Sequence, residues 1–290
     1  MIIPDWNGKP YHSLDYELKQ MFKEKVYKIA LNGGMTCPNR DGHVGTGGCI
    51  FCSSQGSGDF AGSARLSIAE QIRQGKADIS SKRPVHSYIA YFQAFTNTYA
   101  PVETLRALYM EAIADPEVKI LSIATRPDCL GADVLALLDE INQIKPVWVE
   151  LGLQTIHPET SAYIRRGYEL SVFEQAVKEL RAIGITVIVH TILYLPGETK
   201  DDMLDTIHYL NHMDIQGIKL QLLHVLTHTD LAADYEKHPF YIPDMQDYIQ
   251  FLGTCIAHLN PEIVIHRLTG DGPKDLLIAP LWTSNKRTVL

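Results

Sequence analysis

Short apolar runs alternate with amphipathic stretches along most of the chain. The predicted strands are Val26–Leu31, Ser87–Gln93, Lys119–Thr125, Pro146–Gln154, Thr186–Leu195 and Gly217–His224. The stretches between them have apolar residues at helical spacing, and the predicted helices are Ser67–Ser80, Val102–Ala114, Ala132–Ile144, Ser171–Ile183 and Thr199–Met213. Two of these helices start with a capping pattern, Ser67 before Glu70 and Ser171 before Glu174. Such strand–helix alternation is typical of a parallel sheet with right-handed crossovers.

Six strand–helix units predict an α/β fold in the form of a partial (β/α)6 TIM-type barrel with a C-terminal extension. An open doubly wound sheet is the alternative arrangement of the same elements. A seventh extended run follows at Ile263–Arg267. We therefore expect an N-terminal extension over residues 1–25, a barrel over 26–225 with a functional loop at 33–63, and an extension over 226–290 that covers the barrel mouth.

One face of several predicted strands keeps polar residues. Glu150 and Gln154 share a face, His190 lies opposite two valines in the next strand, and Lys219 and Gln221 alternate with apolar neighbours. Strands covered by helices on both faces should instead be almost continuously apolar. If the apolar faces pack on the helices, the polar side chains point into a common lumen, which predicts a binding chamber. A buried hydrogen-bond network that only stabilises the barrel is the simpler alternative.

The composition is that of an ordinary globular protein. The 290 residues are 46% hydrophobic and 21% charged, with a formal net charge of −8. This charge argues against a broadly basic surface, although it allows a local basic patch. No apolar run is long enough for a membrane helix and the N-terminus has no secretory signal, so we expect a cytoplasmic protein. Five cysteines are too few for a disulfide framework, whereas the clustering of three of them suggests a metal.

Cys37, Cys49 and Cys52 have the spacing C-x11-C-x2-C and directly follow the first predicted strand, where barrels place functional loops. Thiolates bind zinc or iron–sulfur clusters, and the cysteines alone do not decide between the two. His43 could complete a closed Cys₃His zinc site. Three cysteines on a four-iron cluster would instead leave one iron open, and the position at the mouth of a polar-lined barrel favours this alternative.

The cysteine segment, its place after the first strand and several later motifs resemble the radical S-adenosylmethionine (SAM) superfamily. The spacing is longer than the usual C-x3-C-x2-C. It is similar to that of the branch containing the catalytic subunit of elongator, and resembles a bacterial family described as oxygen-independent-coproporphyrinogen-oxidase-like. The resemblance runs from about Ile29 to the tail. It implies an enzyme with a [4Fe–4S] cluster on Cys37, Cys49 and Cys52, a 5′-deoxyadenosyl radical made from SAM, and an external electron donor such as flavodoxin or ferredoxin.

The resemblance also implies which residues bind SAM. Phe51 would pack beside the cluster and the adenine, Gln154 resembles a cofactor-binding glutamine, and Arg166 matches an arginine that pairs with the SAM carboxylate. His190 stands where relatives often carry a ribose-binding aspartate. The full set of implied SAM contacts is Phe51, Gln93, Asn97, Glu150, Gln154, Arg166, His190 and His224. It assigns no residue to quenching the substrate radical.

The substrate that the resemblance implies is tRNA, modified on the C5 side chain of a wobble uridine. The specific reaction would convert a carboxymethylaminomethyl group to aminomethyl. A radical SAM enzyme with a small-molecule substrate, a zinc-stabilised RNA-binding module that needs His43, and an iron–sulfur electron carrier are the alternatives. The segment from Tyr11 to Lys28 could stack on bases or form a helix across the barrel, and Arg267 is a candidate on the substrate side. Cys129 and Cys255 are interpreted as structural.

Overall fold

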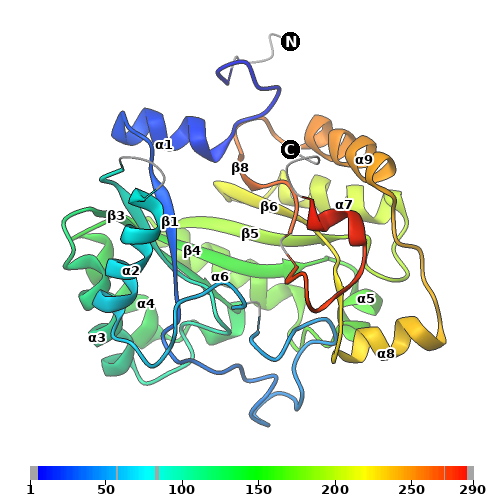
Figure 1. Ribbon diagram of the computed structural model, residues 1–290, viewed down its shortest axis with the longest axis horizontal. Coiled ribbons are helices and arrows are strands. Elements are labelled where there is room, and N and C mark those ends of the chain that lie inside the picture. Colours follow the sequence, from blue (N-terminus) through cyan, green and yellow to red (C-terminus); the bar gives the residue numbers. More distant parts are fainter. Residues whose placement is uncertain (1–5, 57, 82–84, 271, 286–290) are drawn as a thin grey trace.

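The computed structural model describes residues 6–56, 58–81, 85–270 and 272–285. Its main sheet has seven parallel strands in the order β1-β2-β3-β4-β5-β6-β8. These strands are β1 (Tyr27–Leu31), β2 (Tyr88–Phe92), β3 (Val118–Thr125), β4 (Val147–Gln154), β5 (Thr186–Leu193), β6 (Gly217–Leu222) and β8 (Val264–Arg267). The sheet curls into a half-barrel, as Figure 1 shows. The predicted partial barrel is therefore confirmed, and the alternative of an open doubly wound sheet is wrong.

Helices connect successive strands and cover the outer face of the sheet (Figure 1). They are α2 (Ile68–Ser80), α3 (Val102–Ile113), α4 (Ala132–Asn142), α5 (Pro158–Tyr163), α6 (Leu170–Ala182) and α7 (Lys200–Leu210). Ser67 caps α2 as predicted, since its side chain accepts a hydrogen bond from the Glu70 amide. The predicted cap at Ser171 is wrong, because α6 begins one residue earlier and has Glu169 at its N-cap.

The C-terminal part of the chain contributes both to the sheet and to its rim. The predicted seventh extended run is β8, which pairs in parallel with β6. A separate two-stranded sheet joins β7 (Val225–Leu226) to β9 (Leu277–Ala279) in antiparallel fashion. The remaining elements are α8 (Asp230–Lys237), α9 (Met245–His258) and the short 3-10 helices η1 (Pro127–Cys129) and η2 (Leu281–Ser284).

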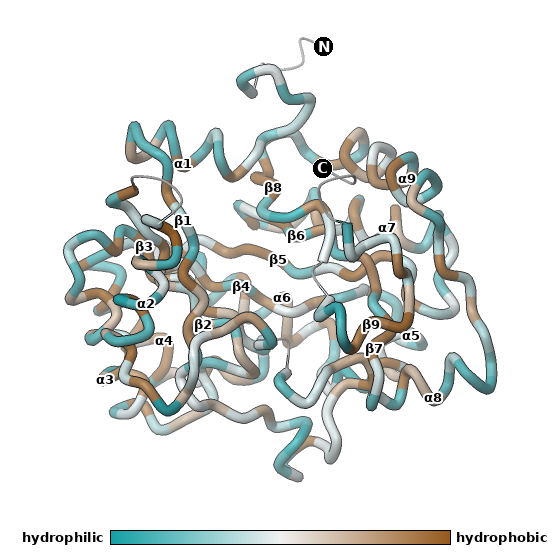
Figure 2. The backbone as a smooth tube through the Cα atoms, in the orientation of Figure 1, coloured by the Kyte–Doolittle hydropathy of each residue, from teal (hydrophilic) through white to brown (hydrophobic). Residues whose placement is uncertain are grey.

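The largest core lies between the sheet and the outer helices. Val149, Leu151 and Leu153 of β4 are fully buried in it, next to Leu137 and Leu138 of α4. The alternate positions of the same strands face the lumen, as the sequence pattern predicted. Figure 2 shows the apolar strands at the centre and mostly polar segments outside. Burial of the outward-facing side chains, worth about 1.5–3 kcal/mol each, therefore fixes which face of each strand is left for the lumen.

The helix α1 (Leu14–Phe22) packs against the inner side of the half-barrel. Its Leu18 belongs to a second apolar cluster with Ile89, Ile120 and Ile188, which lie near the amino-terminal ends of β2, β3 and β5. Ser13 at its N-cap forms a parallel bridge to Ile265 of β8. For the segment from Tyr11 to Lys28, the structure thus supports the predicted helix across the barrel rather than an exposed stacking arm.

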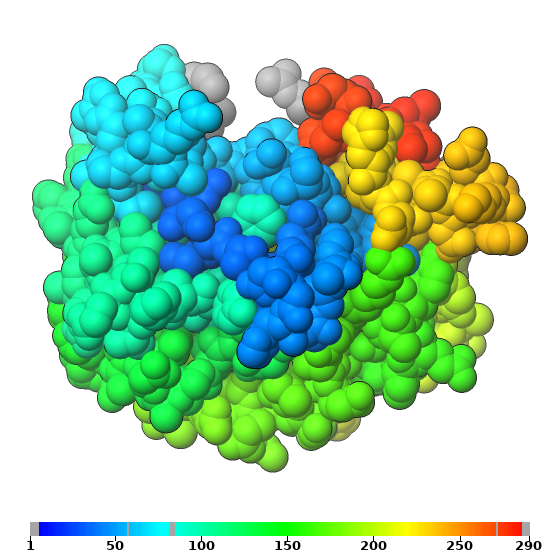
Figure 3. All heavy atoms as spheres, turned by 90° about the horizontal axis from the view of Figure 1, so that it is seen from below, coloured from blue at the N-terminus to red at the C-terminus, as the bar shows by residue number. Residues whose placement is uncertain are grey.

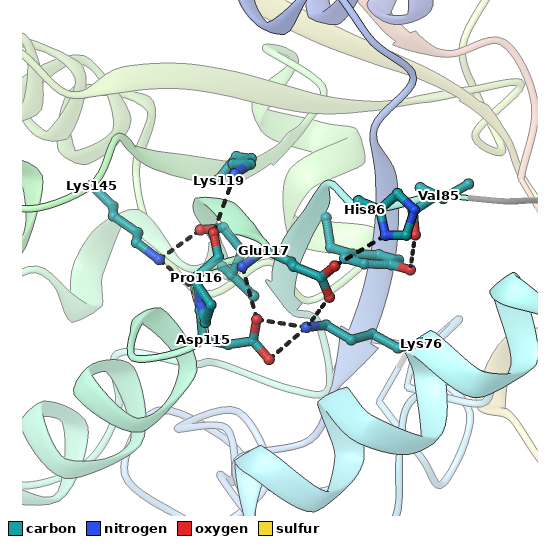
Figure 4. A network of polar contacts seen from close by, with 10 residues as sticks. Lys76, Val85, His86, Asp115, Pro116, Glu117, Lys119 and Lys145 are labelled. Carbon is teal, nitrogen blue, oxygen red and sulfur yellow. Dashed lines mark hydrogen bonds and ion pairs between the residues drawn. The ribbon is translucent and has the colours of Figure 1, made fainter.

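A polar network secures α2 to the loop that precedes β3 (Figure 4). Lys76 Nζ lies 2.6 Å from both carboxylate oxygens of Asp115 and 2.7 Å from Glu117 Oε2. The second Glu117 oxygen lies 3.2 Å from His86 Nδ1, and Lys145 Nζ donates to the Asp115 carbonyl. Burial works against the charge on Asp115, yet the hydrogen bond from Lys76 leaves its carboxyl pKa below the ordinary value.

We expect Lys76→Met to destabilise the protein by about 1 kcal/mol, because two partly buried carboxylates lose their shared cation. The loss should be present at pH 7 and shrink below about pH 4, since the paired carboxylates have lowered pKa values and become protonated there. Urea denaturation at several pH values measures it. Lys178→Met, on the exposed side of α6, is the matched control and should change little. A loss of equal size in both variants would contradict the role of this network.

Candidate functional site

Two adjoining cavities open at the carboxyl ends of the strands, with volumes of about 180 and 410 Å³. They share lining residues from the strands and from the loop after β1, among them Phe51, Cys52, Gln154, Lys219 and Arg267. In Figure 3 that loop, in blue, lies on the same face as the C-terminal extension, in yellow to red. The position matches the functional end of α/β barrels.

The loop after β1 brings Cys37, Cys49 and Cys52 to the wall of the smaller cavity. A tight turn orders the C-x2-C pair, in which the Cys52 amide donates to the Cys49 carbonyl over 3.0 Å. Asn39 Nδ2 lies 3.4 Å from Cys49 Sγ and also donates to the Arg165 carbonyl over 2.6 Å. The loop is therefore fastened to the segment after α5 right beside its second cysteine.

Arg40 fixes the folded path of this loop from inside. Its guanidinium donates to the carbonyls of Cys52 and Ser53 over 3.4 and 2.5 Å and lies over the Phe95 ring. Gly48 packs against the Arg40 side chain and has a φ of +88°. A Cβ at this position would come within 2.9 Å of Arg40 Nε. Only glycine combines this backbone conformation with this close approach.

The environment of Cys49 favours a thiolate. Its pKa is lowered to about 6, first by a hydrogen bond from the Cys52 thiol and further by Asn39 and the positive charges of Arg126 and Arg40, although burial opposes the shift. The pKa of Cys52 is raised, because it is the partner that keeps its proton in that bond. A thiolate is the metal-binding form of cysteine, so the donor set suits a metal centre.

The geometry does not bring His43 to the three cysteines. Its ring lies 6.2 Å from that of Tyr99, and it lines a different cavity together with Cys129. Within the described ranges, no three His, Cys, Asp or Glu side chains are arranged to hold one metal ion. Three thiols around a shared cavity suit a four-iron cluster, which is held at three separate irons, better than the single ion of a Cys₃His zinc site.

A buried charge cluster forms the floor below the cysteines. The Glu150 carboxylate is fully buried and accepts from Lys28 Nζ, Ser122 Oγ and His190 Nε2, each over 2.7 Å, and from Lys219 Nζ. Burial lowers the pKa of Lys219 to about 7 and that of His190 to about 4. Burial opposes the charge on Glu150, yet the positive charges of Lys219 and Lys28 and the hydrogen bond from His190 hold its pKa well below the usual range.

Comparisons with known proteins decide what this arrangement is. Residues 39–210 match the radical SAM superfamily, and residues 215–290 match the radical SAM C-terminal domain. The chain belongs to the radical SAM superfamily. Enzymes of this family use a [4Fe–4S] cluster and SAM, and they need an external electron donor.

Among its relatives, the uncharacterized protein YtqA of Bacillus subtilis is 46% identical over 282 residues, which cover 97% of this chain and 88% of YtqA. Protein YhcC of Escherichia coli K12 is 38% identical over 274 residues, covering 94% of this chain and 87% of YhcC. These two relatives match the chain almost from end to end.

Solved structures share the fold at low identity. Elp3 of the archaeon Methanocaldococcus infernus superposes with a TM-score of 0.68 at 15% identity, over 91% of this chain and 63% of the Elp3 chain. Coproporphyrinogen III oxidase (HemN) of Escherichia coli, a radical SAM enzyme, gives 0.52 at 15% identity, over 86% and 54% of the two chains. Both likenesses confirm the half-barrel. Among the described helices, none has the length and apolar character needed to cross a membrane.

Most of the residues predicted to bind SAM line the two cavities of this radical SAM protein. Phe51, Gln93, Gln154 and His190 line both, and His224 lines the larger one, where its Nε2 lies 3.2 Å from Thr283 Oγ1. Gln154 has a φ of +64°, a conformation that costs a non-glycine residue about 1–3 kcal/mol and is concentrated at functional sites. Its amide lies over Gly152, where a Cβ would come within 2.6 Å of Gln154 Nε2.

Three other predicted contacts are placed differently. Glu150 lines the smaller cavity, but its two oxygens already accept the four hydrogen bonds described above. Asn97 is fully buried away from both cavities, and its Nδ2 donates to the Ala124 carbonyl, which joins the loop after β2 to β3. Arg166 lines the smaller cavity, but its Nε and Nη1 donate to the carbonyls of Tyr168, Leu153 and Thr155. Only its Nη2 remains for the predicted SAM carboxylate.

Sequence reasoning missed three parts of the site. Arg40 holds the cysteine loop, and its position three residues after Cys37 gave no signal of that role. Tyr168 lines the smaller cavity, and the guanidinium groups of Arg126 and Arg166 both lie over its ring. Lys28 lies in the lumen beside Glu150, a position that its alternation with Ile29 in β1 could have indicated.

We expect Glu150→Gln to destabilise the metal-free protein by about 3–5 kcal/mol, because Lys28 and Lys219 would lose their buried counter-charge. Urea denaturation of the variant and of the unchanged protein measures the difference. Glu70→Gln, which removes the carboxylate of an exposed pair with Arg73 on α2, provides the control and should have little effect. Similar unfolding midpoints for the unchanged protein and Glu150→Gln would contradict a structural role for this carboxylate.

Proposed function

We propose that Cys37, Cys49 and Cys52 hold the [4Fe–4S] cluster of this radical SAM enzyme, that SAM occupies the smaller cavity beside them, and that the larger cavity receives the substrate. The single observation that carries this proposal is the convergence of three thiols, one of them with a lowered pKa, on a polar cavity at the carboxyl end of a half-barrel. The separate position of His43 supports an iron–sulfur centre over a zinc centre.

When bound and reduced by an external donor such as flavodoxin or ferredoxin, the cluster supplies the electron that splits SAM into methionine and a 5′-deoxyadenosyl radical. The chain's own residues bind and orient the cofactor and keep water away. Gln93 and Gln154 offer amide groups where β2 and β4 end, and Phe51 and Tyr168 supply apolar walls. Arg166 presents Nη2 to the same cavity. Holding the reacting groups together in a dry chamber is the protein's main contribution to rate.

For the substrate we propose tRNA, with reaction at the C5 side chain of a wobble uridine, specifically the conversion of carboxymethylaminomethyl to aminomethyl. The carboxymethyl carbon next to nitrogen loses a hydrogen atom, which ends in 5′-deoxyadenosine, and one electron, which returns to the external carrier. Water then cleaves the resulting C=N bond and releases the aminomethyl group and glyoxylate. An enzyme that acts on one tRNA base must admit that base to a cavity while the rest of the RNA stays outside. Phe60 suits this task, because it lines the larger cavity and yet remains 60% exposed. An exposed aromatic ring at a cavity rim can stack on an unpaired base.

We expect Cys49→Ala to lose the cluster and with it the reductive cleavage of SAM. The protein is purified without oxygen and reconstituted with iron and sulfide. Metal analysis should then find about four irons per chain in the unchanged protein and far fewer in the variant. With dithionite and SAM, only the unchanged protein should release 5′-deoxyadenosine.

Two matched variants keep this test specific. Cys255→Ala removes a buried thiol in the core of α9, and His43→Ala removes the ligand that a zinc site would need. Both should keep iron content and 5′-deoxyadenosine release. One tightly bound zinc per chain that depends on His43 would overturn the proposal and favour the zinc-stabilised module.

We expect cells that lack the gene to accumulate tRNA with carboxymethylaminomethyl groups at wobble uridines and to lose the aminomethyl form. Mass spectrometry of nucleosides from purified tRNA measures both. Reconstituted enzyme with SAM and dithionite should convert the accumulated nucleoside in tRNA from these cells. Unchanged nucleosides, together with no conversion in vitro by an enzyme that still cleaves SAM, would refute tRNA as the substrate and favour a small molecule.

A further inference from the structure

The floor of the larger cavity is rich in positive charge. Lys28 of β1, Lys219 of β6 and Arg267 of β8 all line it, and in the sheet register Lys219 is paired with Arg267. Among the described lining residues of the two cavities the carboxylates are Glu150 and Asp59, and Asp59 lies in the loop after β1, where Ser53 Oγ donates to it. Three basic side chains therefore face one carboxylate at this depth, although burial lowers the pKa of Lys219 to about 7 and leaves it only partly protonated at pH 7.

The cavity floor has unused hydrogen-bond donors on its basic side chains, whereas its buried carboxylate has no unused acceptor. Glu150 already accepts four hydrogen bonds, two on each oxygen, so it has no lone pair left for a ligand. Lys219 Nζ donates to Glu150 and to Tyr91 Oη, 3.0 Å away, and an ammonium has a third proton to give. Arg267 uses Nη1 for Gln221 over 3.2 Å, and a guanidinium has five N–H groups. The floor thus offers spare donors on Lys219 and Arg267, while the carboxylate of Glu150 is saturated.

Two histidines of the larger cavity, His190 and His266, add no competing positive charge. Burial lowers the pKa of both His190 and His266, so both rings are neutral at pH 7. His266 lines the same cavity, and its Nδ1 is buried with no hydrogen-bond partner in the described structure. A buried polar atom without a partner is costly, and a ligand that supplies one removes that cost.

We propose that Lys28, Lys219 and Arg267 form a binding site for a carboxylate of the substrate. A carboxylate brings the negative charge and the acceptor oxygens that the floor lacks, and a guanidinium matches it with two parallel hydrogen bonds. This inference rests on the proposed function and deepens it. The terminal carboxylate of the carboxymethylaminomethyl side chain binds at the floor, which places the carbon atoms of that side chain higher in the cavity, on the side lined by Phe51 and Cys52.

The test measures binding to the reconstituted holoenzyme by equilibrium dialysis in the presence of SAM. The probes are 5-carboxymethylaminomethyluridine and its neutral methyl ester, which differ only in the charge of the end group. The unchanged protein should bind the acid at least about tenfold more tightly than the ester. Arg267→Gln should lose most of this preference, whereas Arg106→Gln, on the outer helix α3, should keep it. Equal binding of acid and ester by the unchanged protein overturns the inference.

Two further arms separate the possible sources of a carboxylate and the two proposals. The affinity for SAM itself, measured without a probe, should be the same in Arg267→Gln as in the unchanged protein; a large loss there would assign the floor to the SAM carboxylate and overturn the inference. N-acetylglycine and its neutral amide test the floor without a nucleoside. Preference for N-acetylglycine that Arg267→Gln abolishes supports the carboxylate site even where no uridine probe binds, and that result would count against the tRNA substrate alone.

The role of Lys28 is tested by charge rather than by size. Lys28→Arg should keep most of the preference for the acid and the unfolding midpoint, whereas Lys28→Met should lose the preference and unfold earlier, because Glu150 loses a buried partner. Binding is therefore measured under conditions in which both variants are folded. Loss of preference in both variants together with early unfolding would indicate that Lys28 only holds Glu150, and would remove it from the proposed site.

Discussion

The half-barrel depends on one buried carboxylate. A sheet that does not close leaves its first and last strands without mutual hydrogen bonds, and Glu150 of β4 compensates from the inside. It binds Lys28 of β1, Ser122 of β3, His190 of β5 and Lys219 of β6, so a single side chain connects strands across the lumen. Removing one partner from such a buried set leaves an uncompensated charge, which makes the whole arrangement strongly coupled.

The same constraint divides the site into two levels. Glu150 uses up its acceptors on the floor and leaves cations with unused donors there, while the cysteines stand higher on a loop that is held independently. That loop is fastened by Arg40 to its own carbonyls and by Asn39 to the segment after α5. The cysteines proposed to hold the cluster thus lie on a loop. The basic side chains proposed to bind the substrate lie on the strands of the sheet.

Much of the site followed from local sequence signals. The C-x11-C-x2-C segment after the first strand predicted the three thiols of the proposed metal centre, and the period-2 alternation in β4, β5 and β6 predicted that Glu150, His190 and Lys219 face the lumen. Asn97 and Arg166 show what such reasoning does not reveal. Both have the predicted residue type near the predicted strand end, and both donate hydrogen bonds to backbone carbonyls that only folding brings within reach.

The sequence by itself determined the order of strands and helices, the face that each strand buries and the three thiols, because these depend on residues that are neighbours along the chain. Only the tertiary structure decided that Lys28 reaches Glu150 across 122 positions, that Arg267 lies beside Lys219, and that His43 stays away from the cysteines. Those placements follow from the curl of the sheet and from buried charges that must find partners, and both are properties of contacts between distant segments.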